Sequence, residues 1–348
     1  GLLCFGPSQR GAELEGSKAF TKDFLARYQI PTAAYATFTE TAPALVYAQQ
    51  QTFPVVIKAD GLAAGKGVVI AESYDQAQQT IQEMLDERSF GDASGRIVIE
   101  DFLFGEETSF IVITDGDTVI PLATSQDHKR RDDHDLGPNT GGMGAYSPAP
   151  LVTPLLEARI MQEVIYPTLA GLKKDQRPYK GFLYAGLMIN SAGEPKVLEF
   201  NCRLGDPETQ PILIRLKSDL VDLCLATLEG RLNQTSVEWD LRPAVGVVLA
   251  AKGYPDQYAK GEPITHIPDE TPTQKVFHAG TQKVGDQICS NGGRVLCATA
   301  MGHTIQEAKS AAYELVEKIE WAGKFYRTDI SDKAHALISN KAHAPISD

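Results

Sequence analysis

Glycines and lysines gather in one short stretch whose residue types suit phosphate binding. Gly61, Gly65 and Gly67 allow tight turns that bring backbone N–H groups close to an anion. Lys66 adds a positive charge within the stretch, and Lys58 precedes it on an apolar run. The stretch predicts a loop over the phosphates of a nucleotide, although a flexible hairpin with a solvated lysine fits the same residues.

The spacing of this loop differs from that of a Walker A loop. That motif needs four residues between its glycines, a Ser or Thr after the lysine, and a following helix. Here three residues separate Gly61 from Gly65, and a glycine follows the lysine. The β-branched runs Val55–Ala59 and Gly67–Ala71 flank the loop, which predicts a strand–loop–strand flap.

A carboxylate and an amide end a later apolar run. Glu199 and Asn201 lie two residues apart, so strand alternation places them on one face, with Leu198 and Phe200 on the other. Two oxygen ligands on one face suit Mg²⁺, which takes one or two protein oxygens beside phosphates and water. Arg203 follows and can stabilise a developing negative charge. A half-buried strand edge with a polar face is the alternative.

Another strand candidate runs into an acidic connector. Glu100, Asp101, Phe102 and Leu103 can offer backbone groups to an adenine edge, and Glu107 can accept a ribose hydroxyl. An acidic surface turn explains the same residues without a ligand.

A polar, glycine-rich stretch runs from Gln126 to Tyr146, and within it a loop is expected from Asp127 to Gly144. Three consecutive cations and a glycine nest within it suit an anionic substrate, and a solvated charged loop is the alternative. A later aspartate precedes a proline, which predicts a helix start in which it acts as the N-cap. The candidate substrate residues are His128, Arg130, Asn139, Thr140, Gly141, Gly142 and Asp206.

Strands and helices alternate along the chain, which predicts an α/β (α+β) fold. Ser17, Ser73 and Thr304 each precede an amphipathic run and predict helix starts. From about Pro243 onward the chain has strands and a helix of its own, which predicts a small separate domain.

Composition excludes several classes of protein. The net charge of −12 argues against a nucleic-acid surface, which needs clustered Lys and Arg. There is no apolar run near 18 residues, which argues against a membrane span. Five cysteines without a CxxC pair favour a reducing cytoplasm.

Taken together and in order, these pieces resemble the ATP-grasp enzymes and, more narrowly, the phosphoribosylamine–glycine ligase family. The resemblance covers residues 1 to about 330 and is most specific in GPNTGGMGAYSP and LEFNCRLGDPE. The matching stretches are Phe5–Ser8, Leu14–Leu25, Ile30–Ala33, Phe53–Ala71, Ile99–Phe110, Ser125–Arg130, Gly137–Pro150, Leu198–Gln210 and Phe325–Ile330.

The resemblance implies ATP-dependent joining of glycine to 5-phosphoribosylamine through an acyl phosphate, giving glycinamide ribonucleotide, ADP and phosphate in purine biosynthesis. It implies Mg²⁺ or Mn²⁺ as the metal, ATP, glycine and phosphoribosylamine as ligands, and a monomer or weak dimer. The flap would exclude water from the labile intermediates. The implied ATP contacts are Lys58, Gly61, Gly65, Lys66, Gly67, Glu100, Asp101, Phe102, Leu103, Glu107 and Leu198, with Glu199 and Asn201 as metal ligands and Arg203 and Lys66 as catalytic groups.

The expected organisation is an ATP-grasp core with a mobile glycine-rich flap subdomain and a small C-terminal α/β domain. Members of the family usually begin with a further Rossmann-like domain, of which residues 1–15 would be the end. Without that domain, a non-catalytic nucleotide-binding module is the alternative function. The expected segments are the start of the core at 1–50, the flap at 51–104, the metal and substrate core at 105–235, the C-terminal domain at 236–330 and a repetitive, disordered tail at 331–348.

Overall fold

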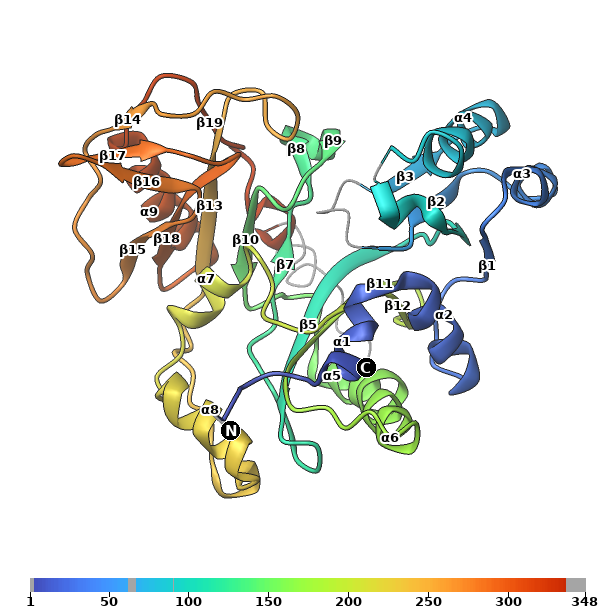
Figure 1. Ribbon diagram of the computed structural model, residues 1–348. Helices are drawn as coiled ribbons and strands as arrows, with labels where there is room; N and C mark the ends of the chain where they lie inside the picture. The colour runs from blue at the N-terminus through green and yellow to red at the C-terminus, as the bar shows by residue number, and fades with distance from the viewer. Residues whose placement is uncertain (1–2, 62–66, 90, 336–348) are drawn as a thin grey trace, which may run out of the picture. The chain divides into compact units, whose positions relative to one another are not determined.

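Figure 1 shows the protein as a computed structural model, which describes residues 3–61, 67–89 and 91–335. The chain divides into two compact units, each built from several stretches of sequence. Helix α8 (Leu220–Glu229) contributes residues to both units. Unit 1 comprises Gly1–Ile120, Pro154–Arg203 and Cys224–Gln234, and unit 2 comprises Pro121–Thr153, Leu204–Leu223 and Thr235–Asp348.

The first sheet of unit 1 contains both strands that were predicted to flank the glycine loop. Its elements are β1 (Tyr35–Phe38), α3 (Thr41–Gln49), β2 (Val55–Ala59), β3 (Val68–Ala71), α4 (Tyr74–Leu85), η1 (Gly91–Gly95) and β4 (Ile97–Asp101). The strand order is β1-β4-β2-β3, and neighbouring strands are antiparallel. Ala44 and Ala48 of α3 and Ile81 and Met84 of α4 pack on the sheet in one buried cluster.

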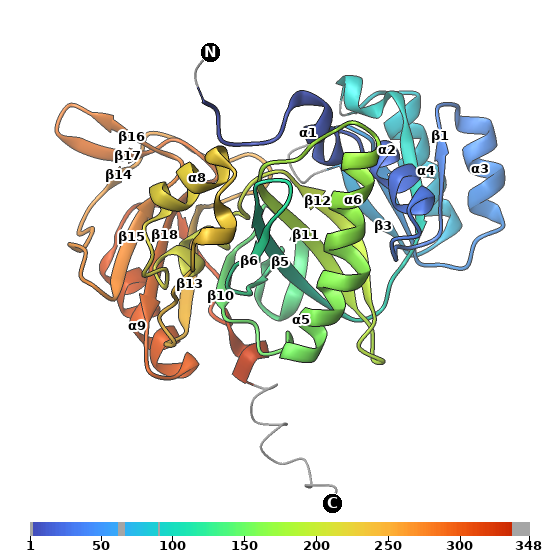
Figure 2. The same ribbon diagram turned by 90° about the horizontal axis from the view of Figure 1, so that it is seen from below.

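The second sheet of unit 1 carries the predicted metal ligands. Its elements are β5 (Glu106–Thr114), β6 (Val119–Pro121), α5 (Pro154–Ile160), η3 (Met161–Ile165), α6 (Tyr166–Lys174), β11 (Gly181–Ile189), β12 (Pro195–Asn201) and η4 (Leu232–Gln234). The strand order is β12-β11-β5-β6. The helical run α5–η3–α6 lies across one face of the sheet (Figure 2).

Two helices lie near the start of unit 1, and the second begins beside Asp60, the residue before Gly61 of the glycine loop. They are α1 (Gln9–Gly16) and α2 (Lys18–Arg27). The predicted helix start at Ser17 is confirmed, because its hydroxyl accepts from Phe20 N at 3.1 Å. Asp60 reinforces it by accepting from Ala19 N at 2.7 Å, which fixes the start of α2 beside the loop.

Unit 2 is built on one large sheet of order β15-β18-β13-β10-β7, with β19 added to β13. Two smaller sheets have the orders β14-β17-β16 and β8-β9. Helix α9 packs on the large sheet through Ala308, Ala312 and Leu315. The elements are β7 (Gln126–Asp127), β8 (Arg130–Asp132), η2 (Asp133–Asp135), β9 (Leu136–Asn139), β10 (Gly144–Ser147), α7 (Thr209–Leu213), β13 (Ala244–Ala251), β14 (Pro263–Ile264), β15 (Gln274–His278), β16 (Thr281–Val284), β17 (Gln287–Ser290), β18 (Arg294–Met301), α9 (Ile305–Lys318) and β19 (Lys324–Phe325).

Three sequence expectations need correction. The expected loop from Asp127 to Gly144 is not a single loop, because it contains β8 and β9 and lies between β7 and β10. Asp206 does not cap a helix: the Asp206–Pro207 peptide is cis and lies in a turn, and α7 begins three residues later at Thr209. The region expected to be a disordered tail begins as packed structure, since Ser331 and Ala334 are buried; residues 336–348 lie outside the described part.

Within the described ranges, the structure contains no helix that is both long enough and apolar enough to cross a membrane.

Candidate functional site

Lys58 lies in a buried charged cluster of unit 1. Its Nζ is 2.9 Å from Glu100 Oε1 and donates to the Leu198 carbonyl at 3.2 Å. Lys22 Nζ lies 2.7 Å from the other oxygen, Glu100 Oε2. Glu100 therefore lies between two ammonium groups, with one on each carboxylate oxygen.

The strand that carries Leu198 has an irregularity at this point. Gly186 of β11 pairs with Glu199, and Leu187 pairs with Val197, so Leu198 is the extra residue of a β-bulge. Because Leu198 has no partner in the ladder, its carbonyl can accept from Lys58. The bulge thus joins the strand of the predicted metal ligands to the strand that precedes the glycine loop.

Glu199 and Asn201 occupy the positions that the sequence predicted on β12. Both are half-buried, whereas Phe200 between them is buried, in agreement with strand alternation. Gly186 opposite Glu199 leaves room for its side chain, since a Cβ at Gly186 would lie 3.2 Å from Glu199 Cγ. Among the described residues no three His, Cys, Asp or Glu form a metal cage. A carboxylate and an amide oxygen fit Mg²⁺, which keeps its remaining positions for phosphate and water.

Arg203 lies next to Asn201, one of the two predicted metal ligands. Its Nη2 donates to Asn201 Oδ1 at 3.0 Å, and its Nε lies 3.1 Å from Glu15 Oε1. About half of its side chain is exposed. The guanidinium is therefore anchored by Glu15 and Asn201 yet open to a ligand, as a group that stabilises phosphoryl charge must be.

The glycine loop is described only at its two ends. Ala59 N donates to Gly67 O at 2.8 Å, which closes the base of the loop. At Gly61 a Cβ would lie 2.8 Å from Ala93 Cβ, so only glycine fits without a shift. Gly65 and Lys66 lie outside the described residues, and their roles remain predictions.

Lys18 is a cation near this site that sequence reasoning missed. Its Nζ donates to the Gly61 carbonyl at 3.0 Å. Burial lowers the pKa of Lys18, while the charge of Glu199 raises it and that of Lys58 lowers it. The charges of Lys18, Glu199 and Lys58 are therefore close enough to influence one another. The only signal in the sequence was its position directly after the cap Ser17.

The predicted adenine contacts differ in how buried they are: Glu100 is buried, and the residues that follow it are exposed or half-buried. Glu100 faces into the charged cluster and pairs with Tyr35 on one side of its strand and Val56 on the other. Neither its side chain nor its strand edge is open, so an adenine edge would use the following residues. Asp101 ends β4, Phe102 and Leu103 form the half-buried connector to β5, and half-buried Glu107 lies on β5 opposite Met188.

His128, in unit 2, does not face a ligand. It is 2% exposed, its Nδ1 lies 3.3 Å from the Gly144 carbonyl, and its Nε2 accepts from Ser331 N at 3.4 Å. Burial, aided by the charges of Arg327 and Lys333, lowers the pKa of His128 to about 4. The prediction of a substrate contact is corrected: His128 is a neutral core histidine.

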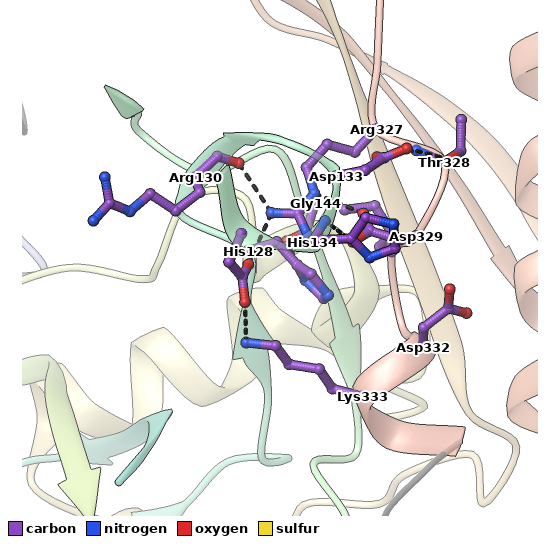
Figure 3. A network of polar contacts seen from close by, with 12 residues as sticks. His128, Arg130, Asp133, His134, Gly144, Arg327, Thr328, Asp329, Asp332 and Lys333 are labelled. Carbon is purple, nitrogen blue, oxygen red and sulfur yellow. Dashed lines mark hydrogen bonds and ion pairs between the residues drawn. The ribbon is translucent and has the colours of Figure 1, made fainter. Parts of the chain in front are cut away.

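Arg130 belongs to a polar network that surrounds His128 (Figure 3). Its side chain donates to Gly137 O at 2.8 Å across the β8–β9 hairpin, and its carbonyl accepts from Arg327 at 3.0 Å. Arg327 is buried and also pairs with Asp135 at 3.0 Å and Asp329 at 2.7 Å. The half-buried Arg130 therefore lies on the β8–β9 hairpin, which the buried Arg327 stabilises through the Arg130 carbonyl.

The predicted glycine nest is tied to Asp206 by a residue that the sequence did not indicate. Arg294 Nη1 donates to the carbonyls of Gly141 at 2.6 Å and Asp206 at 3.1 Å, and Nη2 lies 2.6 Å from Asp206 Oδ2. Thr140 turns inward, because its hydroxyl donates to Lys129 O at 2.9 Å and accepts from Gly142 N at 3.0 Å.

This arrangement brings the predicted substrate residues Gly141, Gly142 and Asp206 together in unit 2. Asn139, at the end of β9, pairs with Arg130 in the hairpin. The substrate candidates therefore form two groups in this unit: the nest with Asp206, and the hairpin with Arg130.

Comparison with known proteins agrees with this geometry. The ATP-grasp (A) domain of phosphoribosylglycinamide synthetase matches residues 16–209, and its C domain matches residues 244–333. The phosphoribosylamine–glycine ligases of Vibrio vulnificus (strain YJ016) and Vibrio parahaemolyticus are 59% and 60% identical over 342 residues. Those matches cover 98% of this chain and 80% of each relative.

Solved structures give the same picture. A phosphoribosylamine–glycine ligase from Thermotoga maritima superposes with a TM-score of 0.87 at 39% identity, covering 94% of this chain and 81% of that one. The biotin carboxylase domain of the Hydrogenobacter thermophilus 2-oxoglutarate carboxylase shares the fold, with a TM-score of 0.73 at 17% identity and coverages of 97% and 77%.

The fold and the lysine, carboxylate and amide groups of unit 1 define an ATP-grasp ligase. More narrowly, the chain belongs to the phosphoribosylglycinamide synthetase family.

Proposed function

We propose that this protein joins glycine to 5-phosphoribosylamine at the expense of ATP. A glycine carboxylate oxygen attacks the γ-phosphorus, ADP leaves, and glycyl phosphate forms. The amine of phosphoribosylamine then attacks the acyl carbon, loses a proton and expels inorganic phosphate, which leaves glycinamide ribonucleotide. Family membership supports this choice of substrates, since the relatives named above are phosphoribosylamine–glycine ligases.

The observation that carries the proposal is the contact between Lys58 and β12, the strand that carries the proposed metal ligands. Lys58 Nζ lies 3.2 Å from the carbonyl of Leu198, the residue before Glu199. A cation that binds phosphate and a carboxylate that binds metal are thereby held in one unit at a fixed separation. Such positioning supplies much of the rate in phosphoryl transfer, where the protein mainly orients groups and neutralises charge.

Mg²⁺, or Mn²⁺ in its place, would be held by Glu199 and Asn201. When bound, it would neutralise charge on the β- and γ-phosphates. Lys58, with Lys18 beside it, would bind phosphate oxygens, and Lys66 would act from the loop. Arg203 would hold the transferring phosphoryl group, and Asp101–Leu103 and Glu107 would bind adenosine.

The residues of unit 2 would contact glycine and phosphoribosylamine. Arg130 offers a guanidinium to the ribose phosphate, because a planar guanidinium recognises phosphate through paired hydrogen bonds. The N–H groups of Gly141 and Gly142 already donate to the hydroxyls of Tyr254 and Thr140, so the turn that Arg294 holds would shape the glycine pocket rather than bind a carboxylate through these groups. Asn139 and Asp206 offer polar side chains for the glycine ammonium and the ribose hydroxyls.

The test is ADP release, with phosphoribosylamine generated in situ from ribose 5-phosphate and ammonia. We expect release to require glycine, phosphoribosylamine and Mg²⁺, and to fall at least about a hundredfold in Glu199→Gln, which loses one metal-ligand charge. Glu194→Gln, which removes an exposed carboxylate just before β12, serves as the matched control with wild-type release. ATP binding without glycine-dependent turnover would contradict the ligase and favour a module that only binds nucleotide.

A further inference from the structure

We propose that Lys22 is a positioning residue for the nucleotide: by sharing Glu100 with Lys58, it leaves the charge of Lys58 available to phosphate. This inference rests on the proposed use of ATP and assigns to α2 a part in that site. The three side chains are 3%, 2% and 9% exposed for Lys22, Glu100 and Lys58. Because these side chains are shielded from water, the electrostatic interactions between their charges are strong.

The charge count of the cluster supports this role. One carboxylate faces two ammonium groups at 2.7 and 2.9 Å, one on each oxygen. Without Lys22, Glu100 and Lys58 would form a closed, neutral pair, and an incoming phosphate would have to compete with Glu100 for Lys58. With Lys22 present, the carboxylate is compensated from the other side.

Hydrogen bonds hold Lys22 where it can do this. Its Nζ donates to Thr32 Oγ1 at 2.7 Å, and the Thr32 hydroxyl donates in turn to the Val197 carbonyl at 2.7 Å. Lys58 donates to the next carbonyl, that of Leu198. The two lysines thus join β4 of the first sheet to the bulge of β12, immediately before Glu199. Burial, opposed by Glu100, lowers the pKa of Lys22 to about 8, so the group is charged at neutral pH.

A purely structural ion pair makes a different prediction from a charge-sharing cluster. If Lys22 only stabilises the fold, removing it weakens stability and leaves ATP affinity intact in the folded fraction. If Lys22 compensates Glu100, then Lys22→Met weakens ATP binding, and the additional change Glu100→Gln restores it by removing the competitor for Lys58. Charge sharing therefore requires that the double variant bind ATP more tightly than the single variant Lys22→Met.

The experiment measures the Kd of Mg-ATP by calorimetry, together with thermal unfolding, for the wild type, Lys22→Met and Lys22→Met/Glu100→Gln. We expect Lys22→Met to weaken binding about tenfold and the double variant to return to within about threefold of the wild type. Lys173→Met is the matched control, since that lysine pairs with Asp117 in the open, and its Kd should not change.

Two results would overturn the inference. One is wild-type ATP affinity in folded Lys22→Met, and the other is a double variant that binds ATP as weakly as the single one. If Lys22→Met does not fold, the double variant is compared directly with the wild type, and tenfold weaker binding by it counts against charge sharing. Because the readout is ATP binding, a failure to turn over glycine would contradict the proposed ligase without deciding the role of Lys22.

Discussion

Lys22 and His128 are both buried, and they respond to burial in opposite ways. Lys22 keeps its proton at neutral pH because Glu100 lies 2.7 Å away. Among the described residues, the hydrogen-bond partners of His128 are the Gly144 carbonyl and Ser331 N. Burial and the charges of Arg327 and Lys333 lower its pKa, and the more weakly acting carboxylates Asp135 and Asp329 oppose them. Residue type alone does not reveal this difference, because both side chains can carry a positive charge.

His128 predicts a loss of stability in acid. Its pKa is about 4 in the folded protein against an ordinary value of 6.5, so below pH 6.5 the unfolded chain takes up a proton that the folded chain refuses. The stability from this residue is complete above pH 6.5 and is lost as the pH falls toward 4, by about 3 kcal/mol. Urea unfolding at several pH values in this window measures it.

The same measurement on variants assigns the effect to one residue. His128→Gln cannot gain a proton here, so its stability should depend less on pH by that amount. His266→Gln removes an exposed histidine and should keep the wild-type pH dependence. Parallel curves for His128→Gln and the wild type would show that His128 is not the group responsible.

At the scale of elements, sequence periodicity predicted most of the strands that carry the proposed nucleotide site. Val55–Ala59 became β2, and Glu199 and Asn201 lie on β12 as alternation required. These predictions succeeded because they depend on neighbours a few residues away. The bulge at Leu198 was not predicted, because it depends on pairing with β11.

Where prediction failed, the deciding partner was distant in sequence. Asp206 has the pattern of a helix cap, but its carboxylate pairs with Arg294, 88 residues further on. His128 was predicted to contact substrate because cations follow it in the sequence. In the structure its Nε2 accepts a hydrogen bond from the backbone N–H of Ser331, which lies 203 residues further on. The sequence analysis did not single out Lys22, because the carboxylate that it contacts, Glu100, lies on another element.

The glycine nest offers a prediction for an element. Gly142 has φ +112°, and a Cβ there would lie 2.3 Å from Pro207 Cδ and 2.7 Å from Asp127 Oδ1. Gly142→Ala should therefore cost at least about 3 kcal/mol of stability, or displace the turn at Asp206. We also expect a raised KM for glycine or phosphoribosylamine in the folded fraction, with Mg-ATP affinity unchanged, since the proposed ATP contacts lie in unit 1.

A second glycine separates backbone strain from the clash. Gly193 has φ +70°, and no described atom lies within 4 Å of the place where a Cβ would stand, so Gly193→Ala meets strain alone. It should cost about 1 kcal/mol and leave both KM values unchanged. Equal unfolding midpoints for the two variants would contradict the close packing of Gly142 against the Asp206 turn.

At the scale of the whole molecule, the proposed site residues fall into two groups, one in each unit. Unit 1 holds the lysine cluster, the proposed metal ligands and Arg203, and unit 2 holds the turn at Gly141, Asp206 and the β8–β9 hairpin. The fold is shared with a biotin carboxylase domain of 17% identity, so the fold alone does not choose the substrates. That choice rests on family membership and on the chemistry of the residues in each unit.

The most direct test of the central claim is to follow the glycine oxygens. With glycine carrying ¹⁸O in both carboxylate positions, one oxygen stays in the amide product and the other leaves with phosphate if glycyl phosphate forms. We predict one ¹⁸O in each inorganic phosphate released, measured by mass spectrometry. Phosphate free of ¹⁸O, released together with ADP, would show that the carboxylate is never phosphorylated and would contradict the proposed reaction.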